Sequence, residues 1–257
     1  SRHRWPAVLG SLAVLLTLAA PMLGMRLGQV DDGSAPTSTT QRRAYDLIKA
    51  GFGPGANGPL VLAMALPKPG ATFAASAVVK AVTHVPGVEA VAPPQLSPGR
   101  DAAVIVVVPS SAPQSVATEQ LVDHLRSSVL PPAVQGTGAT VYVGGITAGY
   151  IDLGQRIQDR LPLFIGAVVG LSFLLLMMVF RSVFVPLKAA VMNLLSIGAS
   201  FGVIVAVFQW GWLKGVVGVS ETTPIVAYVP MMMFAILFGL SMDYEVFLVS
   251  RMHEEWL

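Results

Sequence analysis

The sequence LPLFIGAVVGLSFLLLMMVF at residues 161–180 contains no charged side chain. A helix needs about 20 apolar residues to cross the hydrocarbon core of a bilayer, which is about 30 Å thick. Because lipid offers the backbone no hydrogen-bond partners, such a segment must pair its amides internally, as a helix does. The stretch therefore predicts a transmembrane helix.

Three further stretches reach a similar length without a charged residue: Trp5–Met25, Ala189–Leu213 and Thr222–Met242. We therefore predict four transmembrane helices. A cleaved signal peptide is the alternative for the first stretch, because Arg2 and Arg4 precede an apolar run that ends in small residues. The run is longer than the about 7–15 residues of a typical signal core, which favours a helix that stays in the membrane.

The composition is also that of a membrane protein. Of 257 residues, 54% are hydrophobic and 12% are charged, whereas soluble domains carry about a quarter charged residues. Residues 26–160 hold ten of the 16 basic and nine of the 14 acidic residues, so the rest of the sequence is mostly apolar. A net charge of +2 disfavours a nucleic-acid partner. The absence of cysteine excludes disulfides and thiolate metal sites.

Basic residues near the predicted spans indicate the orientation of the chain. They precede the first span, flank the loop after the second and follow the fourth: Arg2, Arg4, Arg181, Lys188 and Arg251. If the spans alternate, these places lie on one side of the membrane, which the positive-inside rule assigns to the cytoplasm. Lys214, which is predicted to lie on the opposite side, does not fit this orientation. Residues 28–160 are therefore predicted to be extracytoplasmic.

The region between the first two spans has the pattern of an α+β domain. After a short helix predicted at Thr40–Ala50, apolar runs with strand or helix periodicity alternate along the chain. We predict strands at Leu60–Leu66, Gly87–Ala92, Ala102–Pro109 and Thr140–Val143, and helices at Thr72–Thr83 and Pro113–Leu130. This βαββαβ order is that of a ferredoxin-like domain.

The domain ends in GGITAGYIDLGQRIQDRLP at residues 144–162. Two glycines end the last strand, and a polar helix from about Thr147 is predicted to run directly into the second span. Such a helix either transmits motion between the domain and the membrane or is a rigid tether. The predicted organisation is a first transmembrane helix at 1–27, the outer domain at 28–160, and three transmembrane helices at 161–257 that end in a cytoplasmic segment.

The fourth predicted span contains acidic residues within GLSMDYEVFLVSR at 239–251. A carboxylate near the centre of a bilayer costs at least about 2.5–3.5 kcal/mol, and such residues mark ion or proton pathways. We favour a proton-coupling role for Asp243 over a hydrogen bond that only fixes helix packing. Tyr244 supplies a hydroxyl that can pass a proton.

Three polar residues are weaker candidates as neighbours of Asp243. Glu245 lies about 200° around the helix from Asp243, so the two acids do not form a pair, and a packing role is favoured for Glu245. On the third span, Asn193, Ser196 and Ser200 recur at spacings of three and four and form a polar stripe that is predicted to pack against a neighbouring helix or the Asp243 face. No nucleophile–base arrangement, phosphate loop or metal-ligand spacing is present, so we predict no enzymatic activity, cofactor or metal.

Three motifs together resemble one family. GLSMDYEVFLVSRMHEEW at 239–256 is similar to the motif of the MMPL (mycobacterial membrane protein large) transporters of the resistance-nodulation-division (RND) superfamily. The segment at 144–162 and FRSVFVPLKA at 180–189 resemble the same family at the exit from its porter domain. Family members have two similar halves, and DYEVFLVSR resembles the second, C-terminal half. The resemblance implies that the chain is a fragment with a porter domain at 28–160.

The resemblance implies a transporter of the cell membrane, driven by the proton-motive force, that exports lipids or other hydrophobic compounds. Asp243 and Tyr244 stand where the family has its proton-relay pair, and the missing half of the transporter supplies a second pair. The partners implied are membrane lipids, a hydrophobic substrate, protons and that missing half. The alternative is a non-transporting module that senses or binds lipids or sterols, because related members of the superfamily use a similar architecture.

Overall fold

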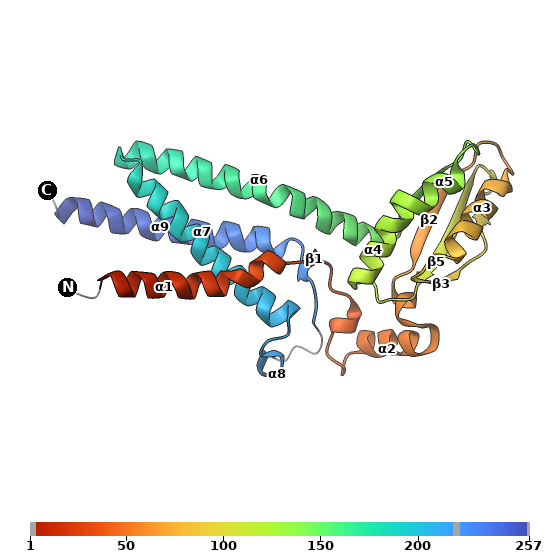
Figure 1. Ribbon diagram of the computed structural model, residues 1–257, viewed down its shortest axis with the longest axis horizontal. Helices are drawn as coiled ribbons and strands as arrows, with labels where there is room; N and C mark the ends of the chain where they lie inside the picture. Colours follow the sequence, from red (N-terminus) through yellow and green to blue (C-terminus); the bar gives the residue numbers. More distant parts are fainter. Residues whose placement is uncertain (1–3, 218–221, 256–257) are drawn as a thin grey trace. The chain divides into compact units, whose positions relative to one another are not determined.

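The computed structural model describes residues 4–217 and 222–255 and divides into two compact units (Figure 1). The sheet unit comprises Gln29–Leu153. The helical unit comprises the chain up to Gly28 together with the chain from Gly154 onward. The fold is α+β, as the sequence predicts.

The sheet unit contains most of the predicted elements close to their predicted bounds. Its strands are β2 Leu60–Ala65, β3 Val88–Val91, β4 Gln95–Leu96, β5 Ala102–Pro109 and β6 Thr140–Gly144. Its α-helices are α2 Thr40–Phe52, α3 Thr72–Thr83, α4 Val116–His124 and α5 Leu130–Val134, with a π-helical turn at Leu125–Val129 between the last two. The sheet is antiparallel, with the strand order β3-β5-β2-β6, and the short β4 pairs with β5.

The helix predicted at Pro113–Leu130 differs from the structure at both ends. It begins at Val116, because the Ser115 side chain caps it by accepting a hydrogen bond from the Thr118 amide, 3.2 Å away. It continues through the π-helical turn into α5 and ends at Val134. The two-residue strand β4 was not predicted, since two residues carry no detectable alternation.

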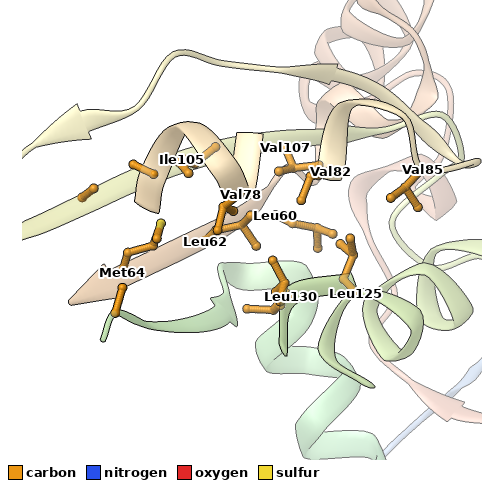
Figure 2. Close-up of a cluster of buried hydrophobic side chains, with 14 of the residues drawn as sticks. Leu60, Leu62, Met64, Val78, Val82, Val85, Ile105, Val107, Leu125 and Leu130 are labelled. Carbon is orange, nitrogen blue, oxygen red and sulfur yellow. The ribbon is translucent and has the colours of Figure 1, made fainter. Parts of the chain in front are cut away.

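The core of the sheet unit lies between one face of the sheet and the helices α3, α4 and α5 (Figure 2). Alternate residues of β2 are buried, and β5 contributes a matching row, so the period of two places one row of each strand in the core. The labelled core side chains of these strands are Leu60, Leu62, Met64, Ile105 and Val107. Each buried leucine or isoleucine contributes about 1.5–3 kcal/mol by leaving water.

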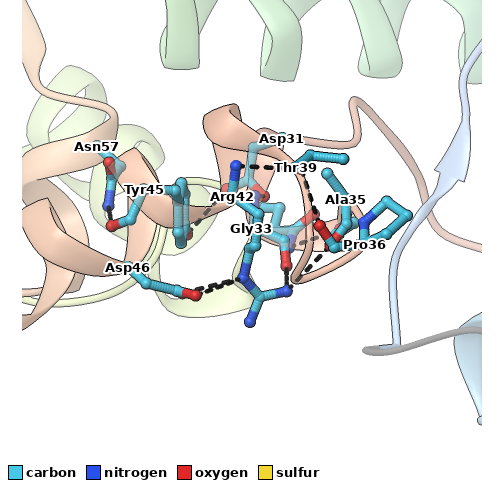
Figure 3. Close-up of polar contacts among 11 residues, drawn as sticks. Asp31, Gly33, Ala35, Pro36, Thr39, Arg42, Tyr45, Asp46 and Asn57 are labelled. Atoms are coloured by element: carbon cyan, nitrogen blue, oxygen red, sulfur yellow. Dashed lines mark hydrogen bonds and ion pairs between the residues drawn. The ribbon is translucent and has the colours of Figure 1, made fainter.

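Polar contacts rather than apolar packing hold the inner face of α2 (Figure 3). The buried Arg42 guanidinium donates from Nε to both carboxylate oxygens of Asp46, at 2.9 and 3.0 Å, and from Nη1 to the Gly33 carbonyl. The Tyr45 hydroxyl donates to Asp31 at 3.1 Å, and the Asn57 amide donates to the Tyr45 carbonyl at 3.1 Å. Arginine suits this position because its fork satisfies several acceptors at once.

The helical unit consists of long apolar helices and a short parallel strand pair. Its elements are α1 Arg4–Ala19 with the 3-10 turn Ala20–Gly24, α6 Ile146–Phe180, α7 Phe184–Ile204 with the π-helical turn Val205–Gln209, α8 Lys214–Val217, α9 Val229–Glu255, and the strands β1 Leu27–Gly28 and β7 Ile225–Val226. The helix α6 begins in the sheet unit and continues without interruption into the helical unit. Within the described residues, three helices are long and apolar enough to cross a membrane: Pro6–Gly24, Ile146–Phe180 and Phe184–Gln209.

The last two predicted spans have different bounds in the structure. Residues predicted to begin the fourth span instead form β7, which pairs with β1, and α9 begins only at Val229. The described apolar part of α9, Val229–Tyr244, is shorter than the length taken for a span. The third helix begins earlier than predicted, at Phe184, and its π-helical turn ends at Gln209, because Gly211 and Leu213 adopt left-handed backbone conformations.

Two glycines allow α1 and α7 to approach closely. A Cβ atom at Gly202 would overlap the Leu18 carbonyl oxygen, so only glycine fits at this crossing. One turn earlier, a Cβ at Gly198 would lie 3.6 Å from the Ala19 Cβ, which is ordinary contact. Small residues spaced four apart permit such close packing in membranes.

We predict that Gly202→Ala lowers the stability of the helical unit by about 1–3 kcal/mol, because the added methyl forces α1 and α7 apart. The matched control Gly198→Ala, on the same face of α7, is expected to be tolerated. Thermal unfolding of the purified chain in detergent measures both variants. Equal unfolding midpoints for the two would contradict the close crossing.

Candidate functional site

The helix α9 packs one aromatic face onto α6 and α7. Phe234 and Phe238 are buried and stack with ring centroids 5.2 Å apart. Phe164 of α6 meets Phe234 edge to face at 5.8 Å, and Ile197 and Phe201 of α7 complete the cluster. Residues spaced four apart share a helix face, so this face of α9 is fixed against its neighbours.

The same face of α9 carries a polar contact to α7. Ser241, one turn beyond Phe238, donates a hydrogen bond from its hydroxyl to the side-chain oxygen of Asn193. Asn193 is only 3% exposed and lies among apolar residues of α7. A buried amide of this kind must be hydrogen-bonded, so the contact fixes the register of the two helices.

Asp243 and Tyr244 lie away from this packed face. Asp243 is about 140° around the helix from Phe238 at 100° per residue, and its side chain is exposed. Tyr244 is 76% exposed. The helix α9 therefore buries the side that carries Phe234 and Phe238, and the side chains of Asp243 and Tyr244 point outward. These two residues are predicted from the sequence to form a proton relay. That role remains a prediction.

The other predicted neighbours lie in different places. Ser200 donates to the Ser196 carbonyl of its own helix at 3.1 Å. Ser196 is exposed, so the polar stripe on α7 does not face a single partner. The side chain of Glu245 lies outside the part of the chain that the structure describes.

The start of α6 is built into the core of the sheet unit. The Thr147 hydroxyl, on a residue that is 4% exposed, donates to the Gly58 carbonyl at 3.0 Å. Ala148 is fully buried in the core cluster. Asp152 forms an ion pair with Arg126, whose Nη2 donates to the carboxylate and to the Val143 carbonyl, both at 2.9 Å. Three kinds of contact thus hold the first two turns of α6.

A pocket of about 570 Å³ lies beside this ion pair. It is formed by α5, β6 and the segment between them, and its walls are mostly apolar: Leu130, Val134, Val141 and Val143 are among them. Ligand-binding pockets have volumes of about 300–1,000 Å³ and similar linings. The pocket therefore has the size and the mostly apolar lining of a small-molecule site.

In the sheet unit, the carboxyl of Asp101 has a shifted pKa. The Ser97 hydroxyl donates to Asp101 at 2.7 Å, and this hydrogen bond holds the pKa of the Asp101 carboxyl below its ordinary value. Since a lowered pKa favours the carboxylate, this contact is present at neutral pH and is lost as the pH falls through the folded pKa. It closes the turn before β5 and has no part in the site.

Among the described residues there is no group of acidic or histidine side chains that could hold a metal.

Comparison with known proteins identifies the family. The model of the MMPL family matches residues 68–257, which include most of the sheet unit together with α6, α7 and α9. The chain belongs to the MMPL family. MMPL proteins are membrane transporters of the RND superfamily, so this chain is a membrane protein, as the sequence predicts.

Three relatives cover nearly the whole chain. Membrane protein YdfJ of Bacillus subtilis is 38% identical over 96% of the chain, which is 34% of YdfJ. The mycolic acid-containing lipids exporter MmpL11 of Mycolicibacterium smegmatis is 34% identical over the full chain, which is 27% of that protein. The heme uptake protein MmpL11 of Mycobacterium tuberculosis is 35% identical over the same shares. The chain thus spans between about a quarter and a third of the length of these relatives.

Three features of the MMPL chain were not predicted from the sequence. Ser241 was not selected as the partner of Asn193, because a lone serine in an apolar helix gives no signal of its direction. The aromatic contact between Phe164 and Phe234 joins residues far apart in sequence. The glycine pair at 198 and 202 was detectable, because GASFG has the spacing of small residues at helix crossings.

We predict that Asn193 and Ser241 are energetically coupled. In a double-mutant cycle of Asn193→Ala and Ser241→Ala, the coupling should be about 0.6 kcal/mol and at most about 1.7 kcal/mol, as such cycles give for hydrogen bonds between membrane helices. Thermal unfolding of the single and double variants in detergent gives this value, and Ser196→Ala, on an exposed position of α7, serves as the neutral control. Strictly additive effects of the two replacements would show that the hydrogen bond does not stabilise the pair.

Proposed function

We propose that the chain is part of a longer proton-driven transporter that exports lipids or other hydrophobic compounds. The observation that carries this proposal is the outward position of Asp243 at the end of the uncharged part of α9, whose opposite side is packed. A relative described as an exporter of mycolic acid-containing lipids supports the substrate class. The two MmpL11 descriptions, lipid exporter and heme uptake protein, differ in cargo, so the particular substrate does not follow from relatives.

The proposed role of Asp243 is to bind and release the proton that drives transport. Protonation removes a charge whose burial near the bilayer centre costs at least about 2.5–3.5 kcal/mol. The neutral acid then allows the outward face of α9 to repack against helices that lie outside this chain. Tyr244 is proposed to pass the proton, and Asn193 to hold α9 in register through Ser241 while this face changes. Ser200 and Glu245 are assigned no step in this relay.

The helix α6 is proposed to transmit the change on α9 to the outer domain. In the helical unit, Phe164 of α6 contacts Phe234 of α9. In the sheet unit, the beginning of the same helix is held by Thr147 and Asp152. Because a helix is stiff along its axis, a displacement at Phe164 is carried along α6. This favours transmission over the tether that the sequence also allows.

The sheet unit is proposed to be a ferredoxin-like, extracytoplasmic porter domain. Its strand order β3-β5-β2-β6, with helices on one face, supports the assignment. The pocket beside Arg126 and Asp152 supports a hydrophobic cargo. In the same proposal α9 crosses the membrane as a fourth span, and the Arg181 turn between α6 and α7 faces the cytoplasm.

We predict that Asp243→Asn in the full-length protein abolishes export while membrane insertion stays normal. The amide has nearly the same shape as the acid but cannot take up a proton. Asp123→Asn, the same chemical change on an exposed position of α4, is the matched control and should leave export unchanged. Export of labelled lipid from cells, normalised to protein in the membrane, measures the effect. Wild-type export by the Asp243 variant would remove the relay role.

Dependence on the proton-motive force separates export from the alternative, a membrane module that senses or binds lipids or sterols. An uncoupler should stop export by the wild-type protein. Lipid binding that is indifferent to the uncoupler, with no net export, would favour the sensing module.

We predict that Thr147→Val weakens the attachment of α6 to the porter domain. Valine keeps the shape of threonine but leaves the buried Gly58 carbonyl without this donor, which costs about 1–3 kcal/mol. Hydrogen exchange of the amides at 146–152 should accelerate and export should fall, whereas Thr140→Val on the exposed side of β6 changes neither. Faster exchange with unchanged export would contradict transmission through α6.

A further inference from the structure

The turn that follows α7 presents large apolar side chains outward. We call residues Trp210–Val216 the tryptophan turn. Its exposed side chains are Trp210 at 47%, Trp212 at 59%, Leu213 at 67% and Val216 at 84%. The two indole rings pack edge to face, with centroids 5.8 Å apart. Neither the helix packing nor the proposed proton pathway uses these residues.

The tryptophan turn has a defined backbone conformation. The amides of Trp210 and Trp212 donate to the carbonyls of Val205 and Ala206 in the preceding helical turn, at 3.0 and 2.8 Å. Leu213 has φ of +57°, a left-handed conformation that is uncommon for a residue with a bulky side chain. Such a conformation persists only where the surroundings hold it. The outward apolar side chains are therefore set by the fold.

Hydrogen bonds fix this turn to the end of α1. The Gln209 side chain donates to the Gly24 carbonyl at 2.6 Å and accepts from the Arg26 amide at 2.9 Å. The Trp210 ring lies beside Gly24, where a Cβ atom would be 3.7 Å from the ring. The tryptophan turn therefore lies level with Gly24 along the axis of α1.

A second tryptophan lies at the other end of the same helix. From Trp5 to Ala19 the α-helix rises about 21 Å at 1.5 Å per residue, and the 3-10 turn to Gly24 adds about 10 Å. The sum, about 31 Å, matches the hydrocarbon thickness of a bilayer, about 30 Å. Tryptophan is enriched at both membrane–water interfaces. Trp5 and Trp210 thus have the spacing of the two interfaces.

We propose that the tryptophan turn is an interfacial anchor that lies in the lipid headgroup layer on the side of the membrane opposite Trp5. The partner is the bilayer surface: the indole rings and the Leu213 and Val216 side chains enter the boundary of the acyl chains. The Lys214 ammonium, the one charge within the turn, meets lipid phosphate. This anchor is independent of whether the protein transports lipids.

The anchor also sets the depth of the intramembrane acid. The strand β7 pairs with β1 just beyond Gly24, and α9 starts at Val229 after β7. Asp243 lies about 21 Å further along α9 at 1.5 Å per residue. With the tryptophan turn in the headgroup layer, Asp243 lies below the middle of the bilayer, in the half nearer to Trp5.

Site-directed spin labelling tests the anchor, and the chain contains no cysteine that would interfere. In the full-length protein, with cysteines elsewhere replaced, single cysteines at Val216 and at Leu194 in the middle of α7 carry a nitroxide. The protein is reconstituted in vesicles of phosphatidylcholine and phosphatidylglycerol. Power saturation with oxygen, which concentrates in the acyl chains, and with a water-soluble nickel chelate then gives the depth of each label.

The label at 216 is expected at the headgroup level, and the oxygen-to-nickel exposure ratio at 194 should be several-fold higher. Replacing Trp210 and Trp212 together by alanine should raise nickel exposure at 216 by at least about two-fold, because the interfacial rings are lost. Two results would overturn the anchor. A label at 216 with the nickel exposure of free water would place the turn outside the membrane. Shielding from both reagents would show that another part of the protein covers it.

Discussion

A carboxylate near the centre of a bilayer costs at least about 2.5–3.5 kcal/mol, and in the proposed arrangement, in which α9 crosses the membrane, Asp243 is such a residue. The rest of the helical unit is arranged around this constraint. Phe234 and Phe238 hold one side of α9 against α6 and α7, and the hydrogen bond from Ser241 to Asn193 fixes its register. The acid is thereby kept on the opposite side of the helix, where its side chain is exposed.

Among the elements of the described residues, α6 alone belongs to both units. The helix α6 is part of the sheet unit's core at Thr147 and Ala148, and part of the aromatic cluster at Phe164. Pro162 lies inside the helix and removes one backbone hydrogen bond between these two ends. The proposed transport cycle depends on this helix, because it is the continuous structure through which repacking on α9 reaches the porter domain.

Much of this arrangement follows from local sequence patterns. The period of two in β2 and β5 and the apolar length of α6 are local properties, so the sequence predicted these elements within a few residues. Features that depend on distant partners were not predicted. Residues 222–228 have the composition of a span, yet Ile225 and Val226 pair with β1, because a strand pairing made by residues about 200 positions apart leaves no local trace.

The candidate site also has some features that local sequence predicts and others that depend on distant partners. Asp243 and Tyr244 were selected because a charge in an apolar run is visible in the sequence. Their outward direction, and the role of Ser241 in fixing it, required the packing of α9. The polar stripe on α7 was predicted as one surface, but only Asn193 is buried, since the glycine crossing with α1 and the aromatic contacts with α9 determine which side of α7 is covered.

The central claim, that proton binding on α9 drives movement of a hydrophobic cargo, is tested most directly by measuring both fluxes in one preparation. The full-length protein would be reconstituted into vesicles with a pH gradient, and proton entry and lipid movement recorded together. The account predicts that protons cross only when a transported lipid is present and that lipid movement stops when the gradient is dissipated. Lipid movement at an undiminished rate without the gradient would contradict it.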